Sequence, residues 1–321
     1  MTWRRSSILV VLLSGLPAWL PAAPVADNEP LKPVPSVPRE PAGKVALGKR
    51  LFNDRRLSGN QTLACSTCHA VGSGGADPRG HSPGVTGQDS GINAPTVLNA
   101  ALNFRQFWDG RAADLKMQVD DVVQNPMEMG ARWPQVIAML HADAGYVTQF
   151  AEVYPDGVTA TNVRDALACY ERTLLTPGSR FDRYLQGDEG AISGAEKAGY
   201  DAFKQYGCAA CHQGVNVGGN MFQKFGVMGD YFAARGAVTQ ADLGRYNVTG
   251  DPDDRYVFKV PGLRNVARTA PYFHDGSAPD LEHAVDVMFR YQLGRVPDPQ
   301  DKAAIILFLR TLTADPPEAV P

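Results

Sequence analysis

The sequence has few cysteines, no long apolar run beyond its first residues and a small net charge. It has 5 cysteines and 6 histidines among 321 residues, too few for a dense disulfide framework. Beyond residue 23 no stretch approaches about twenty uninterrupted apolar residues, so we expect no membrane span in the mature chain. The formal net charge is -3, which argues against a nucleic-acid surface. Strand signals are weak throughout, which predicts a mainly α fold.

The first residues have the layout of a secretory leader. Two arginines precede a short apolar run over residues 8–13, and small residues follow at Ala22 and Ala23. The run is too short and too interrupted for a retained membrane anchor, so cleavage is favoured. We predict a signal peptide over residues 1–23 and export, to the periplasm if the source is bacterial. Residues 24–41 are rich in proline and lack periodicity, which predicts an extended tether.

Four of the five cysteines fall into two copies of the motif Cys-x-x-Cys-His. The motif residues are Cys65, Cys68 and His69 in the first copy and Cys208, Cys211 and His212 in the second. This spacing attaches c-type haem, because two thiols bond to the porphyrin and the histidine ligates the iron. A redox dithiol or half of a zinc site would not explain an adjacent histidine twice. We therefore predict two covalently bound haems; Cys169 lies in an apolar helical stretch and is expected to be a buried, unreactive thiol.

The surroundings of the two motifs also repeat. An amphipathic helix with apolar residues between Val45 and Phe52 precedes the first motif, and a capping box at Ser193 opens a helix before the second. About a hundred residues after each motif a further helix is predicted, over residues 162–174 and 298–312. A helix before and a helix after the haem site, present twice, indicates a duplicated unit.

The length of the chain also favours two domains, since 321 residues exceed the usual size of one. A turn-rich segment over residues 176–179 marks the boundary. We predict a mainly α chain of two tandem cytochrome c-type domains, each with one covalently bound haem. They are an N-terminal haem domain over residues 42–178 and a C-terminal haem domain over residues 179–321.

Four segments around the motifs resemble the bacterial dihaem cytochrome c peroxidase family, which also contains the MauG-type enzymes. They are Ile92–Thr96, Gln106–Arg111, Asn125–Met129 and Ala270–Gly276. The resemblance covers residues 42–312. It implies reduction of hydrogen peroxide at the N-terminal, peroxidatic haem, which His69 would ligate. Electrons from a small c-type cytochrome or a cupredoxin would arrive at the C-terminal, electron-transfer haem, which His212 would ligate.

The resemblance assigns roles to three further side chains. Met288, fourteen residues after His274, matches the second ligand of the C-terminal iron, although its helix face would also suit a core residue. Thioether ligation raises a haem potential, which suits electron uptake. Glu128, thirty-five residues after Asn93, matches a catalytic acid–base that moves a proton between the peroxide oxygens, although it could be a surface charge. Trp108 matches an aromatic residue between the haems, where packing alone would also explain it.

Asn93 and the main-chain carbonyls of Thr269 and Pro271 match an interdomain calcium site of the family. Oxygen donors suit this hard cation, but Asn-Ala-Pro is also an ordinary turn. Family members commonly form homodimers, and this sequence carries no interface signature of its own. Calcium and a homodimer are therefore expectations from the resemblance alone.

One position departs from the family pattern. In many members a second histidine ligates the resting peroxidatic iron, about sixteen residues after the first, and here that count reaches Val85. The loop over residues 72–91 has one histidine, His81. Either this glycine-rich loop rearranges so that His81 ligates the iron, or the iron is open to peroxide without reductive activation. The ungapped count favours the open site.

Two alternatives to peroxide reduction remain. A MauG-like oxidase of a partner protein would carry a tyrosine as the second ligand of the C-terminal iron; Met288 argues against this, although Tyr291 lies nearby. A non-catalytic dihaem electron carrier would need neither an open iron nor an acid–base, and Glu128 argues against it.

Overall fold

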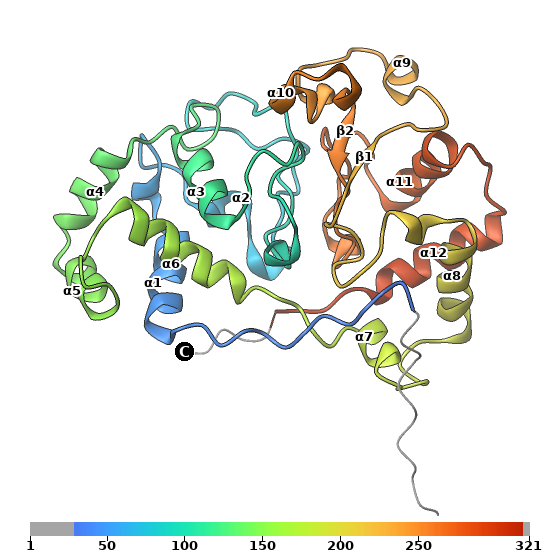
Figure 1. Ribbon diagram of the computed structural model, residues 1–321, viewed down its shortest axis with the longest axis horizontal. Coiled ribbons are helices and arrows are strands. Elements are labelled where there is room, and N and C mark those ends of the chain that lie inside the picture. The colour runs from blue at the N-terminus through green and yellow to red at the C-terminus, as the bar shows by residue number, and fades with distance from the viewer. Residues whose placement is uncertain (1–28, 317–321) are drawn as a thin grey trace, which may run out of the picture.

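The computed structural model describes residues 29–316, which form two lobes (Figure 1). The N-terminal lobe contains α1 (Ala42–Phe52), α2 (Cys65–Cys68), α3 (Leu115–Gln124), α4 (Trp133–His141), α5 (Ala144–Val153) and α6 (Ala160–Arg172). The C-terminal lobe contains α7 (Arg180–Leu185), α8 (Gly194–Gln205), α9 (Tyr231–Arg235), α10 (Tyr246–Thr249), α11 (Leu281–Val287) and α12 (Pro299–Thr311). Strands β1 (Phe222–Lys224) and β2 (Val257–Lys259) pair antiparallel. The predicted mainly α class is confirmed.

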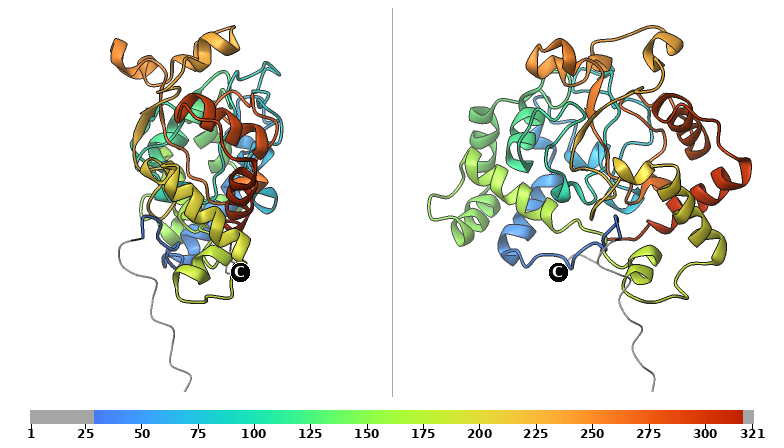
Figure 2. Two further views of the ribbon diagram at one scale, coloured as in Figure 1. Left: turned by 90° about the vertical axis from the view of Figure 1, so that its right-hand side faces the viewer. Right: turned by 45° about the vertical axis from the view of Figure 1, so that its right-hand side comes forward.

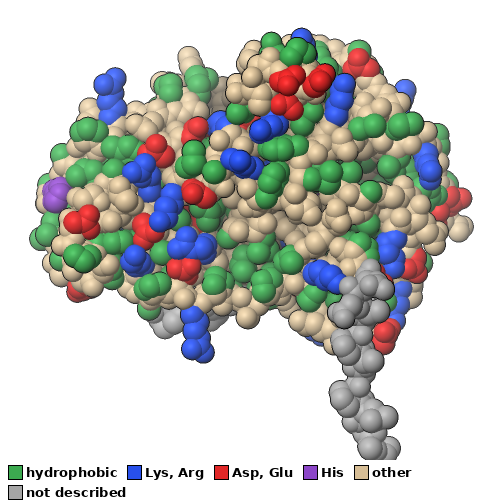
Figure 3. Space-filling view, viewed as in Figure 1, with side chains coloured by type: hydrophobic (Ala, Val, Ile, Leu, Met, Phe, Trp, Pro, Cys, Tyr) green, Lys and Arg blue, Asp and Glu red, His purple; other side chains and the backbone are tan. Residues whose placement is uncertain are grey.

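The ribbon and space-filling views show two further features. Helices α9 and α10 protrude at the top of the molecule (Figures 1 and 2), and on the face in Figure 3 acidic and basic side chains intermix without a large field of one sign. Within residues 29–316 no helix combines the length and the apolar character needed to cross a membrane. The predicted signal peptide over residues 1–23 lies outside the described residues.

Each lobe is built on one crossing of two helices, and both crossings involve helices that the repeat predicts. In the N-terminal lobe α1 packs on α6, and a Cβ at Gly48 would lie 2.0 Å from the carbonyl oxygen of Ala166. In the C-terminal lobe α8 packs on α12, and a Cβ at Gly199 would lie 1.9 Å from the carbonyl oxygen of Ala304. Only glycine permits such close backbone contact. The duplicated unit therefore extends to its helix packing.

A second repeated element joins the two lobes. Asn99 and Asn265 both have left-handed backbones, with φ of 60° and 61°, which asparagine tolerates better than most residues. Their side-chain amides donate to the same hydroxyl oxygen of Thr176, at 2.8 and 3.0 Å. Thr176 is 1% exposed. The turn-rich segment at the predicted domain boundary is therefore a buried joint between the repeats.

The described part of the predicted tether, residues 29–41, is extended and runs along the lower edge of the molecule (Figure 1). It does not hang free. Leu31 is fully buried in the core of the C-terminal lobe, and its neighbours exchange main-chain hydrogen bonds with Gly214. The main-chain N–H of Val34 donates to Asp182 at 3.2 Å. This segment is thus a strap whose first part packs on the C-terminal lobe, whereas Glu40 near its end pairs with Arg172 on α6 of the N-terminal lobe.

Candidate haem sites

Helix α2 presents the first attachment motif. Cys65 and Cys68 lie one helical turn apart, and His69 follows directly as the C-cap. The Nδ1 of His69 donates to the carbonyl oxygen of Gly75 at 3.0 Å, which leaves Nε2 unprotonated in the neutral ring. Burial lowers the pKa of His69 and keeps the ring neutral. The ring is thus prepared to ligate a metal through Nε2.

The second motif repeats this arrangement. Cys208 begins a 3₁₀ turn that ends at Ala210, and Cys211 and His212 follow. The Nδ1 of His212 donates to the carbonyl oxygen of Val217 at 3.3 Å, and burial lowers the pKa of His212 to about 4. Both histidines therefore present the same nitrogen as a ligand.

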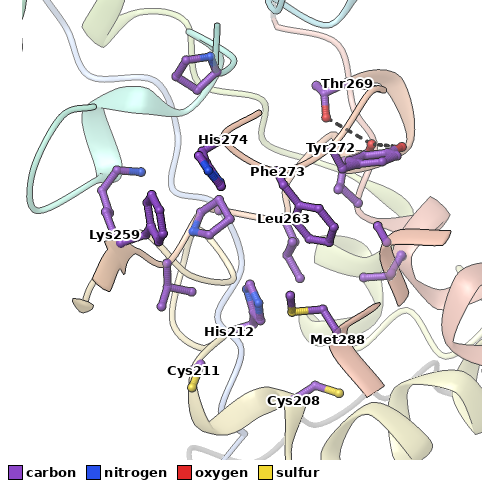
Figure 4. Close-up of a pocket in the computed structure, with 18 of the residues that line it drawn as sticks. Cys208, Cys211, His212, Lys259, Leu263, Thr269, Tyr272, Phe273, His274 and Met288 are labelled. Carbon is purple, nitrogen blue, oxygen red and sulfur yellow. Dashed lines mark hydrogen bonds between the residues drawn. The ribbon is translucent and has the colours of Figure 1, made fainter. Parts of the chain in front are cut away.

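A cavity lies beside the second motif, with Cys208, Cys211 and His212 on its wall (Figure 4). Its other lining is largely apolar and includes Phe203, Leu263, Val285, Phe289 and Leu309. Met288 begins a π-helical turn, Met288–Gln292, directly after α11, and its sulfur faces His212 in Figure 4. The structure thus brings together an imidazole and a thioether, the ligand pair of a cytochrome c iron.

Lys259 is a buried cation on the wall of this cavity. It is 6% exposed and lines the cavity, and burial lowers the pKa of its ammonium to about 8. Among the residues that the structure describes, none accepts a hydrogen bond from this ammonium. A buried cation requires an anionic partner, and the carboxylates of a haem would provide one. The thiols, the imidazole, the thioether and this cation together fit a c-type haem.

Arg264, another basic residue on the wall of the cavity, has a different role. It is 2% exposed and pairs with the buried Asp182 at 2.8 Å. Its guanidinium also donates to the carbonyl oxygen of Lys32 in the strap, at 2.8 Å. Both residues line the cavity, but Arg264 is neutralised by Asp182 and fixes the strap, whereas no described residue accepts a hydrogen bond from the Lys259 ammonium.

Glu128 is partly buried, with 26% of its side chain exposed, and its charge acts on Cys68 of the first motif. Its carboxylate accepts a hydrogen bond from the Asn125 amide at 2.9 Å, and the nearest guanidinium nitrogen of Arg111 is 3.9 Å away. Burial, opposed by Arg111, raises the pKa of Glu128 to about 7. Burial, Asp77 and the charge of Glu128 all raise the pKa of the Cys68 thiol. The carboxyl group is thus near the first attachment site and can exchange a proton near neutral pH.

The loop that departs from the family pattern lies against Glu128, but it places no histidine there. The main-chain N–H of Val85 donates to the carbonyl oxygen of Glu128 at 2.7 Å. His81 points elsewhere: its Nε2 donates to the carbonyl oxygen of Asp275 at 3.1 Å, and its Nδ1 lies 3.0 Å from a carboxylate oxygen of Asp89. Both ring nitrogens of His81 are therefore engaged in contacts between loops.

Trp108 and Asn93 connect the lobes at the cavity wall. The indole N–H of Trp108 donates to the carbonyl oxygen of Asn93 at 2.9 Å, and its ring lies edge-on to His274. The Asn93 amide donates to the carbonyl oxygen of Pro271 at 2.8 Å. Thr269 lines the same cavity. The structure therefore gathers three predicted calcium-site residues beside Trp108.

One buried ion cluster was not predicted from the sequence. His274 lies 2.7 Å from Asp242, and Arg235 pairs with both Asp242 and Asp275. Burial alone would raise the pKa of Asp242, but hydrogen bonds from His274 and Arg235 hold this pKa well below its usual range. Because Arg235 already balances the carboxylates, the cluster stabilises the turn around His274. No sequence motif marks Asp242 or Arg235.

The fifth cysteine behaves as the sequence predicts. Cys169 is 2% exposed, and burial raises the pKa of its thiol to about 11. A guanidinium nitrogen of Arg172 lies 3.0 Å from its sulfur. The thiol is therefore neutral and shielded, which makes it a poor nucleophile.

Comparison with known proteins identifies the family. Residues 42–190 match the family model described as di-haem cytochrome c peroxidase. The chain is 47% identical over 291 residues to a cytochrome c peroxidase of Escherichia coli, covering 90% of this chain and 62% of that protein. It is 42% identical to the cytochrome c551 peroxidase of Nitrosomonas europaea, covering 99% of this chain and 94% of that protein.

A solved structure gives the same answer at the level of the fold. The crystal structure of a MauG-like protein associated with microbial copper homeostasis matches with a TM-score of 0.77 and 31% identity, covering 90% of this chain and 95% of that one. The relatives named as peroxidases are the more similar in sequence. The chain therefore belongs to the di-haem cytochrome c peroxidase family, a family of haem-dependent peroxidase oxidoreductases.

Proposed function

We propose that the protein reduces hydrogen peroxide to water at the His69 site, with electrons that arrive through the His212 site. The difference between the sites supports this assignment best. Beside the first motif stands Glu128, a carboxyl group with a pKa of about 7; opposite His212 stands Met288. The haem bound at the first site would supply the redox chemistry that splits the O–O bond.

Glu128 serves as the acid–base of this reaction. Its carboxylate takes a proton from the incoming peroxide and returns it to the departing oxygen, which leaves as water. A pKa near neutrality suits both steps, because the group must bind the proton and then release it. The Asn125 amide at 2.9 Å orients the carboxylate. The neighbouring main chain of Val85 contributes no competing acid or base.

Met288 and Trp108 serve the supply of electrons. A thioether ligand favours the reduced iron, so the His212 site accepts electrons from a small c-type cytochrome or a cupredoxin. Trp108 lines the cavity of this site and comes from the N-terminal repeat, which suits it to shorten the path between the sites. The periplasm, as expected from the leader, is the compartment where such donors and covalent haem attachment meet.

We further propose that the peroxidatic iron is open in the resting enzyme. The contacts of His81 with Asp89 and Asp275 support this, because a ligating histidine would have to give up its Nε2 bond. The position of Val85 beside Glu128 supports it as well. The enzyme would then turn over without prior reduction of the second site.

We propose that calcium binds at the contact between the lobes around Asn93. The side-chain oxygen of Asn93 and the carbonyl oxygens of Thr269 and Pro271 are donors of the type that calcium prefers. The main-chain N–H of Asn93 donates to the carbonyl oxygen of His274 at 2.7 Å. Such an ion would therefore stabilise this contact, to which the indole of Trp108 is hydrogen-bonded.

A MauG-like oxidase is the second candidate, favoured by the structural match to a MauG-like protein. In this chain Tyr291, the nearest tyrosine to Met288 in the sequence, packs edge-on against Tyr231 with ring centroids 5.3 Å apart. Tyr291 and Met288 both pack against the same hydrophobic cluster, but Met288 lines the cavity and Tyr291 is not among its lining residues. Peroxide reduction is therefore preferred.

Steady-state kinetics with a reduced small c-type cytochrome as donor test the assignment. We expect peroxide-dependent oxidation of the donor at two donor molecules per peroxide. A protein that carries both haems but oxidises the donor no faster with peroxide than without it would contradict the proposal and leave the electron-carrier alternative.

A further inference from the structure

We propose that Asp109 and Asp121 hold Arg111 away from Glu128, and that Asp121 is thereby a positioning residue for proton transfer. The inference rests on the proposed role of Glu128 as acid–base. It concerns a side chain on α3 that neither contacts an attachment motif nor lines the cavity beside Met288.

Arg111 is hydrogen-bonded to two aspartates. Two of its nitrogens meet the two carboxylate oxygens of Asp121 at 3.0 and 3.2 Å, and a third lies 3.1 Å from Asp109. The guanidinium also stacks over Phe107, 3.5 Å from the ring centroid. Its distance to Glu128 is 3.9 Å, too long for a hydrogen bond. The paired acidic partners, not Glu128, therefore determine where the guanidinium lies.

The consequence for Glu128 depends on this distance. A carboxylate in a close, bidentate pair with arginine has its pKa lowered by about 1–3 units and cannot easily hold a proton at neutral pH. Here the hydrogen-bond donor to Glu128 is instead the neutral Asn125 amide. Burial is the main cause that raises the pKa of Glu128, Arg111 lowers it, and Asp121 and Asp109 raise it again. The carboxyl group thus keeps a proton that a free Arg111 would displace.

Two further groups interact with Glu128, a main-chain N–H and a cysteine of the first motif. The loop over residues 77–91 meets Glu128 through the main chain of Val85. Cys68 on α2 is affected by the charge of Glu128, but its thiol is consumed when the haem is attached. The side-chain charges that act most strongly on Glu128 are those of Arg111, Asp121 and Asp109.

The substitution Asp121→Asn tests the inference. It removes a negative charge near Glu128 and frees Arg111 to approach it, and both changes lower the pKa of Glu128. We expect the low-pH limb of kcat/KM for peroxide to shift by about one pH unit toward acid. Asp120→Asn is the matched control, since Asp120 lies next in the chain but pairs with Arg164 and Trp133. Asp121→Glu keeps the charge and should keep the limb of the wild type.

Infrared titration of the haem-loaded protein supplies a readout that does not depend on turnover. The carboxylic acid band that disappears in Glu128→Gln should titrate at lower pH in Asp121→Asn than in the wild type or in Asp120→Asn. Equal titration in all three would overturn the role of Asp121. Full peroxide activity in Glu128→Gln would instead overturn the proposed function, so the two failures are distinguishable.

Discussion

Each lobe contains a copy of one repeated segment, and the two copies carry different side chains at corresponding positions. In each lobe an isolated β-bridge closes a turn, between Gln106 and Ala112 in the first and between Tyr272 and Ala278 in the second. The turns contain Phe107 and Phe273, whose φ angles are 68° and 71°. The next residue is Trp108 in one copy and His274 in the other. Identical geometry thus presents an indole in one lobe and an imidazole in the other.

The helix that follows each turn carries the larger difference. Asp114 caps α3 and Asp280 caps α11, so the two helices correspond residue by residue. Counted from these caps, Met288 corresponds to Val122. The N-terminal lobe therefore has no thioether at this place, and the chain after α3 returns with Glu128 instead. If the proposed function is right, a few side chains on a shared scaffold separate a site for chemistry from a site for electrons.

Glu128→Gln should produce the largest effect. Loss of the acid–base is expected to lower kcat/KM for peroxide about 10²–10⁴-fold, with both haems attached and electron uptake at the His212 site unchanged. Stopped-flow mixing with peroxide measures the first quantity, and reduction by ascorbate measures the second. Glu152→Gln on α5, an exposed position, is the control. A loss smaller than tenfold would contradict the role of Glu128.

Leu31→Ala tests whether the buried Leu31 part of the strap stabilises the C-terminal site alone. Truncating this fully buried side chain should cost about 2–5 kcal/mol of unfolding free energy, measured by denaturant titration. The absorption bands of the His69 haem should persist to higher denaturant than those of the His212 haem. Leu307→Ala, at a 37% exposed leucine, should have little effect. Equal destabilisation of both sites would contradict a Leu31 contact that serves one lobe.

Met288→Leu removes the thioether but keeps the apolar bulk. The potential of the C-terminal haem should fall, and each 59 mV of decrease makes electron uptake about tenfold less favourable. Potentiometric titration measures the change, with Met228→Leu as control because Met228 is 63% exposed. An unchanged potential would show that Met288 is a core residue and not a ligand.

The two lobes should also respond in opposite ways to pH. In the N-terminal lobe burial raises the pKa of Glu171 to about 8 from 4.5, so the stability associated with its protonation is present below pH 4.5 and is lost as the pH rises through 8. In the C-terminal lobe the lowered pKa of Asp242 gives stability that is present above 3.8 and is lost in acid. Glu171→Gln should flatten the alkaline loss, and Asp242→Asn the acid loss, in thermal melts followed at each haem. A melt of Glu171→Gln that keeps the full alkaline loss would contradict this account.

His81→Ala should have the smallest effect on catalysis. If His81 only joins loops, its removal leaves the rate of the oxidised enzyme with peroxide within about twofold of the wild type. A rate that rises strongly in the oxidised variant would mean that His81 had blocked the iron.

The family resemblance, and not the sequence pattern alone, assigned roles to Met288 and Glu128, which remain predictions. The sequence alone predicted the attachment motifs and the paired helices. Spacing preserves these because covalent attachment and helix periodicity are local. It did not predict the buried Leu31, since a proline-rich segment carries no sign of where it packs. It also missed the cluster around Asp242 and the sharing of Arg111, which depend on contacts between residues distant in the chain.

Electron paramagnetic resonance of the fully oxidised protein tests the central contrast between the sites most directly. The account predicts one high-spin ferric signal, from the open His69 site, and one low-spin signal, from the His212 and Met288 site. Two low-spin signals, with peroxide activity only after reduction, would contradict it and return His81 to the iron.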